Sequence, residues 1–436
     1  MDRQAYLDQI ESMIRGLDQD GYEITDEHTR GWEFYFIRHE LDQNRVKDVD
    51  RLEITLYKKS EDGQFLGSAT GEIPEGLGRD EILKALQDLL FQATLVRNPV
   101  YSLNQPDSCA PAPQESEPID LAEIAGSYIR AMKQVPETAA EDINSYEIFV
   151  NELTTTFRNS EGIRIRSRRP SSMIEVVANA RRDGHEIELY RNYKSGTCDS
   201  DKLVRDLTET LRCGRDKLEA GPTPKLGTAT VILSTEAAVS LYEYFLYQMH
   251  AMLKLRGLST WELDRPIAED VIGDRITIRA VTELPNSSEN RLFDEEGARI
   301  TDKYLLTGNI PRSFWGPRQF SQYLGLEESF IVHNFVVSGG SRSAADLRKG
   351  DYLELLEFSD FQADPMTGDI AGEIRLGYWH HDGKVDVVSG GSVSGSLKDY
   401  LKEMYISEET VQYNSAVIPA VTRLQNVTIT GVKDPD

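Results

Sequence analysis

The sequence predicts an α+β protein of two domains. A mixed α/β domain is expected over residues 1–220, and residues 225–436 are expected to form antiparallel sheet, as a partial barrel, with one long helix. Three observations predict this. The 436 residues exceed one ordinary core. Hydrophobic residues make up 39%, which suffices for packed interiors. Finally, Gly221-Pro222-Thr223-Pro224 interrupts the chain between a region of mixed helices and strands and a region of short strands.

The first half is expected to alternate helices with strands. Leu52, Ile54 and Leu56 alternate with polar neighbours, which is the period of a half-buried strand. The proline-rich stretch 98–118 has no such period, so we expect an exposed loop inside the first domain. Helices are expected over 3–17, 79–93, 120–133 and 199–219, and strands over 32–39, 51–58, 65–73, 146–157, 163–167, 174–180 and 186–193.

The second half begins with a strand over 228–233 that enters a long helix over 235–254. The remainder consists of short apolar runs separated by turns such as Leu306-Thr307-Gly308-Asn309 and Asp382-Gly383. Short strands with frequent turns are typical of antiparallel sheets and barrels, which gives the predicted character of this domain.

The composition limits the classes of binding partner and the cellular locations that we expect for this protein. The net charge of −25 repels phosphates, so we expect no nucleic-acid partner. No run reaches the roughly 18 apolar residues of a membrane helix, and the first residues mix charges with apolar residues, unlike a signal peptide. We therefore expect no membrane contact and a cytoplasmic location. The cysteines Cys109, Cys198 and Cys213 are far apart and odd in number, which favours reduced thiols.

Common catalytic motifs are absent from the sequence. It has no phosphate-binding loop of the G-x-x-x-x-G-K-[ST] type and no G-x-S-x-G elbow. His380 and His381 are adjacent, so on a strand they would point to opposite faces and could not share a metal. His333 lies in an apolar run, where a hydrogen-bonded structural histidine is common. The favoured interpretation is that no histidine is catalytic.

One basic strand is a candidate binding surface. Arg164 and Arg166 alternate with apolar residues, so one strand face is cationic and can hold a peptide carboxylate or an acidic strand. A solvated strand face is the alternative, and it is the commoner one. Arg164, Arg166 and His333 are the candidate peptide-binding residues.

Several C-terminal motifs are similar to those of the TldD/PmbA family. The Thr367-Gly368-Asp369 turn precedes a hairpin leading into Gly395-Ser396-Leu397-Lys398-Asp399, which resembles the "G-N-L-K-D" stretch of PmbA-type chains. Phe293-Asp294-Glu295-Glu296-Gly297 resembles the "FDSEG" turn, and the segment 424–431 resembles a closing "VTIxG" strand. The resemblance covers about 225–436 and extends in part to 145–220, where 157–162 resembles an "NSxG" hairpin.

The zinc motif of the family is degenerate in this chain. Catalytic TldD-type chains carry His-Glu-x-x-x-His at the start of the long helix, and a cysteine near the C-terminus completes their site. The matching positions hold Thr235, Glu236 and Ser240, and no cysteine follows Cys213. A shift of one residue would place Ser234, Thr235 and Val239 there instead. Because neutral hydroxyls are poor zinc ligands, we expect no metal and no catalytic residue in this chain.

The resemblance implies a non-catalytic PmbA-like (TldE-like) subunit of a zinc metalloprotease that degrades or matures unfolded peptides. A TldD-like partner would supply the zinc, and older names such as modulator of DNA gyrase would reflect processing of gyrase-directed peptides. Two alternatives stay open: a homodimer that binds peptides without cutting them, and a metallopeptidase whose metal has moved to His333, His380 or His381. The role of Glu236 is open, because a carboxylate in the first helical turn also favours the helix dipole.

Overall fold

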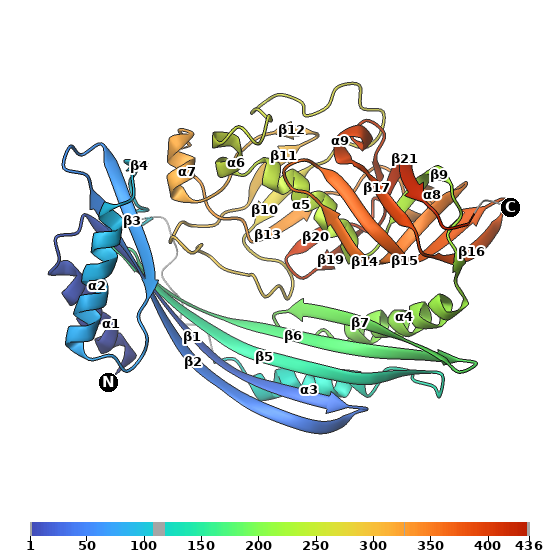
Figure 1. Ribbon diagram of the computed structural model, residues 1–436, viewed down its shortest axis with the longest axis horizontal. Helices are drawn as coiled ribbons and strands as arrows, with labels where there is room; N and C mark the ends of the chain where they lie inside the picture. The colour runs from blue at the N-terminus through green and yellow to red at the C-terminus, as the bar shows by residue number, and fades with distance from the viewer. Residues whose placement is uncertain (1, 108–117, 327, 434–436) are drawn as a thin grey trace.

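The computed structural model describes residues 2–107, 118–326 and 328–433. A long curved sheet from the first half of the chain runs beneath a β-rich body from the second half (Figure 1). The predicted α+β class is therefore confirmed. Cys109 and residues 108–117 of the proline-rich loop lie outside the described residues. No helix in the described ranges is long and apolar enough to cross a bilayer.

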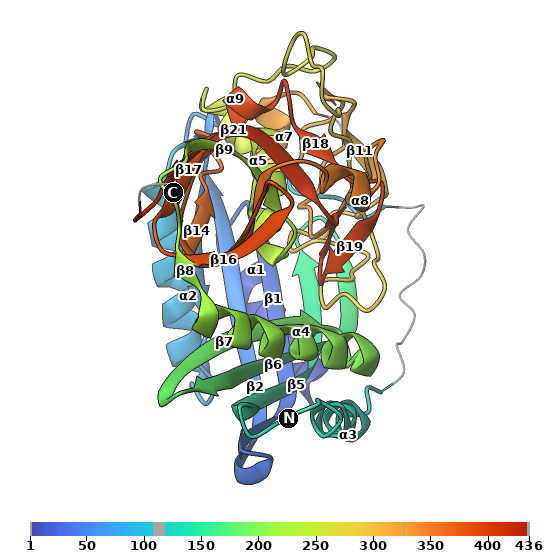
Figure 2. The same ribbon diagram turned by 90° about the vertical axis from the view of Figure 1, so that its right-hand side faces the viewer.

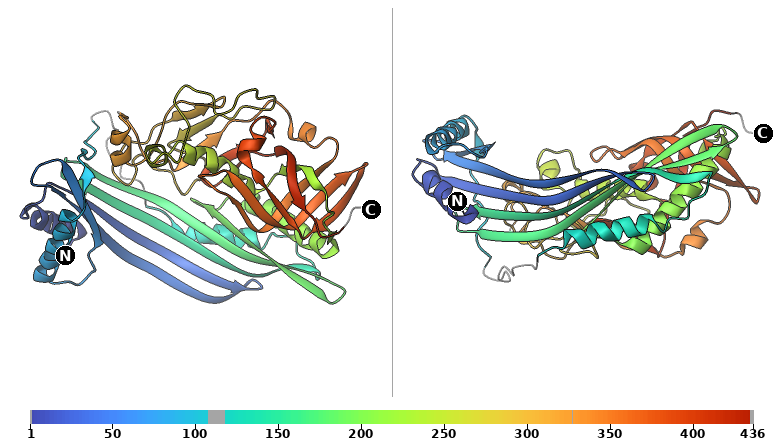
Figure 3. Two further views of the ribbon diagram at one scale, coloured as in Figure 1. Left: turned by 45° about the horizontal axis from the view of Figure 1, so that its top comes forward. Right: turned by 90° about the horizontal axis from the view of Figure 1, so that it is seen from below.

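The first sheet is entirely antiparallel, with strand order β4-β3-β2-β1-β5-β6-β7. Its long strands extend under most of the molecule (Figure 3). The turn before β7 contains Asp183 and Gly184, both with positive φ, as expected for a tight hairpin. The strands are β1 (Gly21–Ile37), β2 (Glu40–Lys59), β3 (Phe65–Glu72), β4 (Asn98–Pro99), β5 (Glu141–Asn159), β6 (Arg164–Arg182) and β7 (His185–Ser195).

Four helices bury apolar stripes against this sheet. Helices α1 (Arg3–Arg15) and α2 (Arg79–Thr94) form one core with β1 and β2. Helices α3 (Leu121–Met132) and α4 (Ser200–Glu219) form a second core with β5 and β6. The predicted helices over 3–17, 79–93, 120–133 and 199–219 are confirmed to within a few residues.

The strand β6 is longer than predicted. Two strands, over 163–167 and 174–180, were expected, but the chain runs as one strand from Arg164 to Arg182. The polar residues around Pro170, and Pro170 itself, interrupt the apolar pattern, so the sequence did not indicate that the strand is continuous. Pro170 is tolerated because pairing with β7 starts only at Ser172, so this part of β6 has a neighbouring strand on one side.

The second half forms two sheets around a shared core. One sheet has the order β12-β11-β10-β13-β20-β19, and the other β14-β9-β21-β17-β15-β16-β8. Because β14 also pairs with β15, the second sheet curls into the predicted partial barrel. The strands are β8 (Gly221–Pro222), β9 (Gly227–Leu233), β10 (Ile278–Val281), β11 (Lys303–Thr307), β12 (Ile310–Pro311), β13 (Asn334–Val337), β14 (Tyr352–Ala363), β15 (Asp369–His381), β16 (Lys384–Ser389), β17 (Ser392–Ser396), β18 (Tyr405–Ile406), β19 (Thr410–Tyr413), β20 (Ala416–Pro419) and β21 (Thr422–Thr430).

The long helix predicted over 235–254 is broken. A 3-10 turn (Glu236–Ala238) leads into α5 (Val239–Gln248), and α6 (Ala251–Leu255) follows after a break. The break arises because His250 is extended and its Nδ1 accepts the Met252 N–H at 3.1 Å, while its ring packs edge-on against Trp315. A tertiary contact thus overrides the helical pattern. The other short helices are α7 (Arg318–Tyr323), α8 (Ala344–Leu347) and α9 (Leu397–Tyr400).

The backbone of the second half packs closely against the first half at Gly297. Its φ is +74°, and a Cβ there would lie 2.8 Å from Phe157 and 3.1 Å from Ile163, both in the first domain. The neighbouring Glu296 carbonyl accepts a hydrogen bond from Asn104 at 3.1 Å. The turn therefore docks through bare backbone, which only glycine permits.

Gly297→Ala should lower the free energy of unfolding by about 2–4 kcal/mol, from the positive φ and from overpacking. Gly308→Ala is the matched control, because Gly308 also has positive φ but no atom lies within 4 Å of its Cβ position. Urea denaturation of both variants measures the difference. Equal losses would show that the close approach contributes nothing to stability.

Candidate functional site

A cavity of about 1070 Å³ lies between the two domains. Its floor comes from β7 and α4, and its roof from the start of the α5 segment and from β14 and β15. Figure 2 shows α4 beside β7, the edge strand of the first sheet, beneath the C-terminal body. A smaller hollow of about 180 Å³ adjoins it and shares Tyr193, Glu236 and Tyr413. The expected zinc-motif segment therefore borders an interdomain space.

Two sheet edges border this space. Strand β7 ends the first sheet and contributes Arg191 and Tyr193, while β19 ends the six-stranded sheet and contributes Val411 and Tyr413. An edge strand carries backbone N–H and C=O groups without a strand partner. Phe358 and Phe361, whose rings lie 4.6 Å apart, add an apolar wall. This combination suits an extended peptide, which can add to an edge and bury side chains.

The hydroxyls at the degenerate motif are engaged within the protein. Ser234 donates to Glu354 at 2.6 Å, Thr235 to the Leu356 carbonyl at 3.3 Å, and Ser240 to the Ala237 carbonyl at 2.8 Å. Within residues 2–107, 118–326 and 328–433, no group of three His, Cys, Asp or Glu side chains is placed to hold a metal. Zinc in proteins is held by thiolate, imidazole and carboxylate ligands, and neutral hydroxyls are poor ligands beside these, so the three residues do not fit a zinc ion.

Glu236 differs from these hydroxyls because it faces open space. Its side chain is reached by solvent and lines both the cavity and the hollow. Burial by the surrounding protein raises the pKa of Glu236, and the charges of Lys202 and Lys194 oppose that rise. Its carboxylate makes no hydrogen bond or ion pair with any residue that the structure describes.

The other carboxylates of the cavity are paired. Glu354 binds Arg348 at 2.6 Å, and Glu209 binds Arg212 at 2.9 Å. Asp206 pairs with Lys202, and Glu357 pairs with Arg191 across the domain boundary. Arg212 also donates to Tyr378 of β15 at 2.9 Å, so these pairs both line the cavity and join the domains.

The predicted peptide-binding arginines lie away from the cavity. Arg164 is exposed on β6 and binds Glu11 of α1 at 2.7 Å, so it serves the first domain's own packing. Arg166 is exposed on the same strand, opposite Thr156. Neither arginine lines the cavity. The pairing of Arg164 with Glu11 was not evident from the sequence, because the two residues are far apart in it. Their role in binding stays a prediction.

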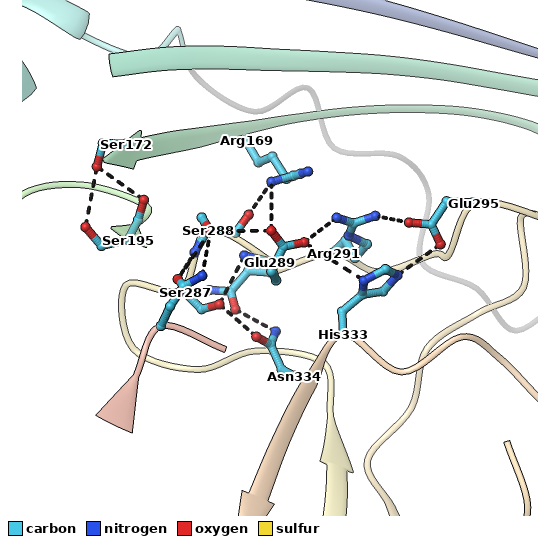
Figure 4. Close-up of polar contacts among 12 residues, drawn as sticks. Arg169, Ser172, Ser195, Ser287, Ser288, Glu289, Arg291, Glu295, His333 and Asn334 are labelled. Carbon is cyan, nitrogen blue, oxygen red and sulfur yellow. Dashed lines mark hydrogen bonds and ion pairs between the residues drawn. The ribbon is translucent and has the colours of Figure 1, made fainter. Parts of the chain in front are cut away.

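His333 belongs to a polar network at the domain boundary (Figure 4). Its Nε2 lies 3.0 Å from Glu295, and Arg291 bridges Glu295 and Glu289 at 2.5 Å each. Arg169 of β6 reaches Glu289 at 4.0 Å and the Ser288 carbonyl. Burial would raise the pKa of Glu295, but the His333 hydrogen bond and the Arg291 charge lower it to about 2. His333 therefore lies beside the contacts of Arg169 with Glu289 and Ser288, which join the first half of the chain to the second.

The adjacent histidines of β15 point to opposite faces, as predicted. His380 stacks on Tyr352 with centroids 4.2 Å apart, and burial lowers its pKa. His381 pairs with Asp386 at 2.7 Å. They do not share a metal site.

Sequence reasoning missed the cavity residues of α4. Lys202, Arg205, Glu209 and Arg212 recur at spacings of three and four, so they form one polar stripe. That stripe was visible in the sequence, but nothing local showed that it would face another domain.

Comparison with known proteins agrees with the fold. Residues 226–431 match the family model of the PmbA/TldA metallopeptidase C-terminal domain. The structure is similar to TldE from Thermococcus kodakarensis (16% identity, TM-score 0.77, covering 98% of this chain and 100% of that one). It is also similar to candidate modulators of DNA gyrase from Thermotoga maritima (15%, 0.77, 98% and 99%) and Bacteroides thetaiotaomicron (14%, 0.78, 99% and 100%). No curated protein matches the sequence significantly.

These findings first define a class: the second domain is a metallopeptidase-related domain of the PmbA/TldA type. The family model and the fold together support the resemblance to the TldD/PmbA family that the motifs indicated.

Three carboxylates meet at the Gly297 junction. Burial raises the pKa of Glu23, Asp294 and Glu296 to about 7 each. Their charges reinforce one another: the charge of Asp294 raises the pKa of Glu23, that of Glu23 raises the pKa of Glu296, and that of Glu296 raises the pKa of Asp294. Tyr57 donates to Glu23 at 2.8 Å, and the Arg318 backbone N–H donates to Glu296 at 2.6 Å, which only partly offsets burial. Tyr101, Glu295 and the Arg318 charge also face this group.

Stability should fall as the pH rises from 5 to 8. The folded-state pKa values lie above the unfolded ones, so this stabilisation is complete below about pH 4 and is lost through about pH 7. Each pKa unit corresponds to about 1.4 kcal/mol, so we expect a loss above about 2 kcal/mol. Glu23→Gln should flatten the dependence and the exposed-turn control Glu61→Gln should not, in urea titrations at several pH values. A flat wild-type profile would contradict the prediction.

The purified chain should retain less than about 0.1 equivalent of zinc after exposure to excess zinc and desalting, because the motif hydroxyls are not zinc ligands. Elemental analysis measures the retained metal. Stoichiometric zinc that His380→Ala or His381→Ala removes would instead favour the relocated site.

Proposed function

We propose that this chain is a non-catalytic, peptide-holding subunit of a zinc-dependent peptidase, acting with a TldD-like partner. The observation that carries the proposal is the interdomain cavity, whose zinc-motif border is occupied by engaged hydroxyls. A cavity large enough for a peptide, beside motif positions that lack zinc ligands, favours binding of a peptide without its hydrolysis. Zinc, in the partner, would supply the activated water.

The residues of this chain would act on the peptide backbone and its apolar side chains. An extended peptide adds to the edge of β7, where main-chain hydrogen bonds give affinity with little sequence preference. Phe358 and Phe361 bury apolar side chains of the peptide. Unfolded chains present both features, whereas folded proteins satisfy their own backbone groups, so unfolded peptides are the proposed substrate class.

Two structural neighbours are named as candidate modulators of DNA gyrase, but we propose no nucleic-acid partner for this chain. Its net charge of −25 opposes binding to phosphates. A role in maturation of peptides, including gyrase-directed peptides, requires no DNA contact.

The purified chain should bind an unfolded fluorescent peptide without cleaving it, and cleavage should require a chain with an intact His-Glu-x-x-x-His motif. Anisotropy measures binding, and mass spectrometry measures cleavage. Replacing alternate peptide amides by N-methyl amides should weaken binding about tenfold or more, because strand addition needs those donors. Phe361→Ala should also weaken it, whereas Phe91→Ala, exposed on α2, is the control.

Light scattering of the chain alone and with the candidate partner separates the heteromeric assembly from a peptide-binding homodimer. A partner that is fully active alone and never associates with this chain would contradict the proposal.

A further inference from the structure

The cavity contains one carboxylate that makes no direct ion pair or hydrogen bond with any described residue. Asp206, Glu209, Glu354 and Glu357 each pair with a lysine or arginine, as set out above. Glu236 has no such pair. Charges in a partly enclosed space are stabilised mainly by partners, because fewer waters reach them. Among the described residues, Glu236 is therefore the cavity carboxylate that lacks a contacting cation, although the charges of Lys202, Lys194 and Arg191 act on it at longer range.

The position of Glu236 makes it accessible to a ligand. It begins the 3-10 turn after β9, it is solvent-exposed, and it lies where the large cavity meets the small hollow. β7 passes on the opposite wall with Tyr193. A peptide added to the β7 edge would thus direct side chains or its terminus towards this carboxylate.

We propose that Glu236 is a specificity-determining residue that binds the ammonium group of a peptide held in the cavity. The proposal rests on the proposed peptide-holding function. The group is a lysine side chain or the amino terminus, which share the same chemistry.

An ammonium ion fits this position better than a metal. It has three N–H donors and needs no set of protein ligands, so a single carboxylate suffices. A divalent cation would need several, and the described residues offer no such group. The nearby Lys202 is already paired with Asp206, so it does not neutralise Glu236 directly.

Three otherwise identical unfolded peptides test the proposal: N-acetylated with one lysine, N-acetylated with glutamine instead, and the glutamine peptide with a free amino terminus. At least one ammonium-bearing peptide should bind the wild type about tenfold more tightly than the acetylated glutamine peptide, a typical gain for a charge-assisted hydrogen bond. Glu236→Gln should abolish that difference. The free-amine and lysine arms identify which source is used.

Two controls separate a direct contact from general electrostatics. Glu209→Gln removes a paired carboxylate from the same cavity, and Glu243→Gln removes an exposed carboxylate from α5 that does not line it. Both should keep the discrimination. Equal wild-type affinity for all three peptides would overturn the inference and leave the proposed function standing. If no peptide binds at all, the proposed function fails and this inference fails with it.

Discussion

The placement of the second domain on the first is constrained by the close approach at Gly297. A turn of the second domain rests there on Phe157 and Ile163 of the first, with no side chain between them. At a second point, Asn286 exchanges hydrogen bonds with Thr197, accepting its N–H at 2.7 Å and donating to its carbonyl at 2.6 Å. Gly297 does not line the cavity, whose walls are joined by side-chain contacts such as Arg191 with Glu357 and Arg212 with Tyr378.

Charge is handled differently at the surface and inside the cavity. The chain as a whole is strongly acidic, but the cavity's carboxylates are matched by arginines and lysines. Interdomain pairs such as Arg191 with Glu357 therefore hold the walls together as well as neutralising them. Since a partly buried pair gives little net stability but a lone buried charge is costly, this pattern fixes geometry more than it adds stability. Because Glu236 has no direct ion-pair partner among the described residues, a cationic ligand would form a new ion pair there without displacing an existing one.

The sequence predicted the elements better than their extent or placement. Periodicity located the helices, because the apolar stripes of α2 and α4 repeat at helical spacing. It failed at Pro170, where a neighbour-free edge tolerates a proline, and at His250, where Trp315 stabilises a break. Both outcomes depend on partners distant in sequence. For the same reason the motif position of Glu236 could be predicted, whereas its exposure to a cavity walled by β7 could not.

The hydroxyls at the positions that resemble the zinc motif take part in hydrogen bonds within the protein. Thr235 now donates to a carbonyl of β14, and Ser234 donates to Glu354, which Arg348 also binds. The start of the helical segment is thereby joined to the neighbouring strand by side-chain hydrogen bonds. Histidine at position 235 would remove the Thr235 contact. The carboxylate of Glu236 takes no part in this hydrogen bonding and faces the cavity.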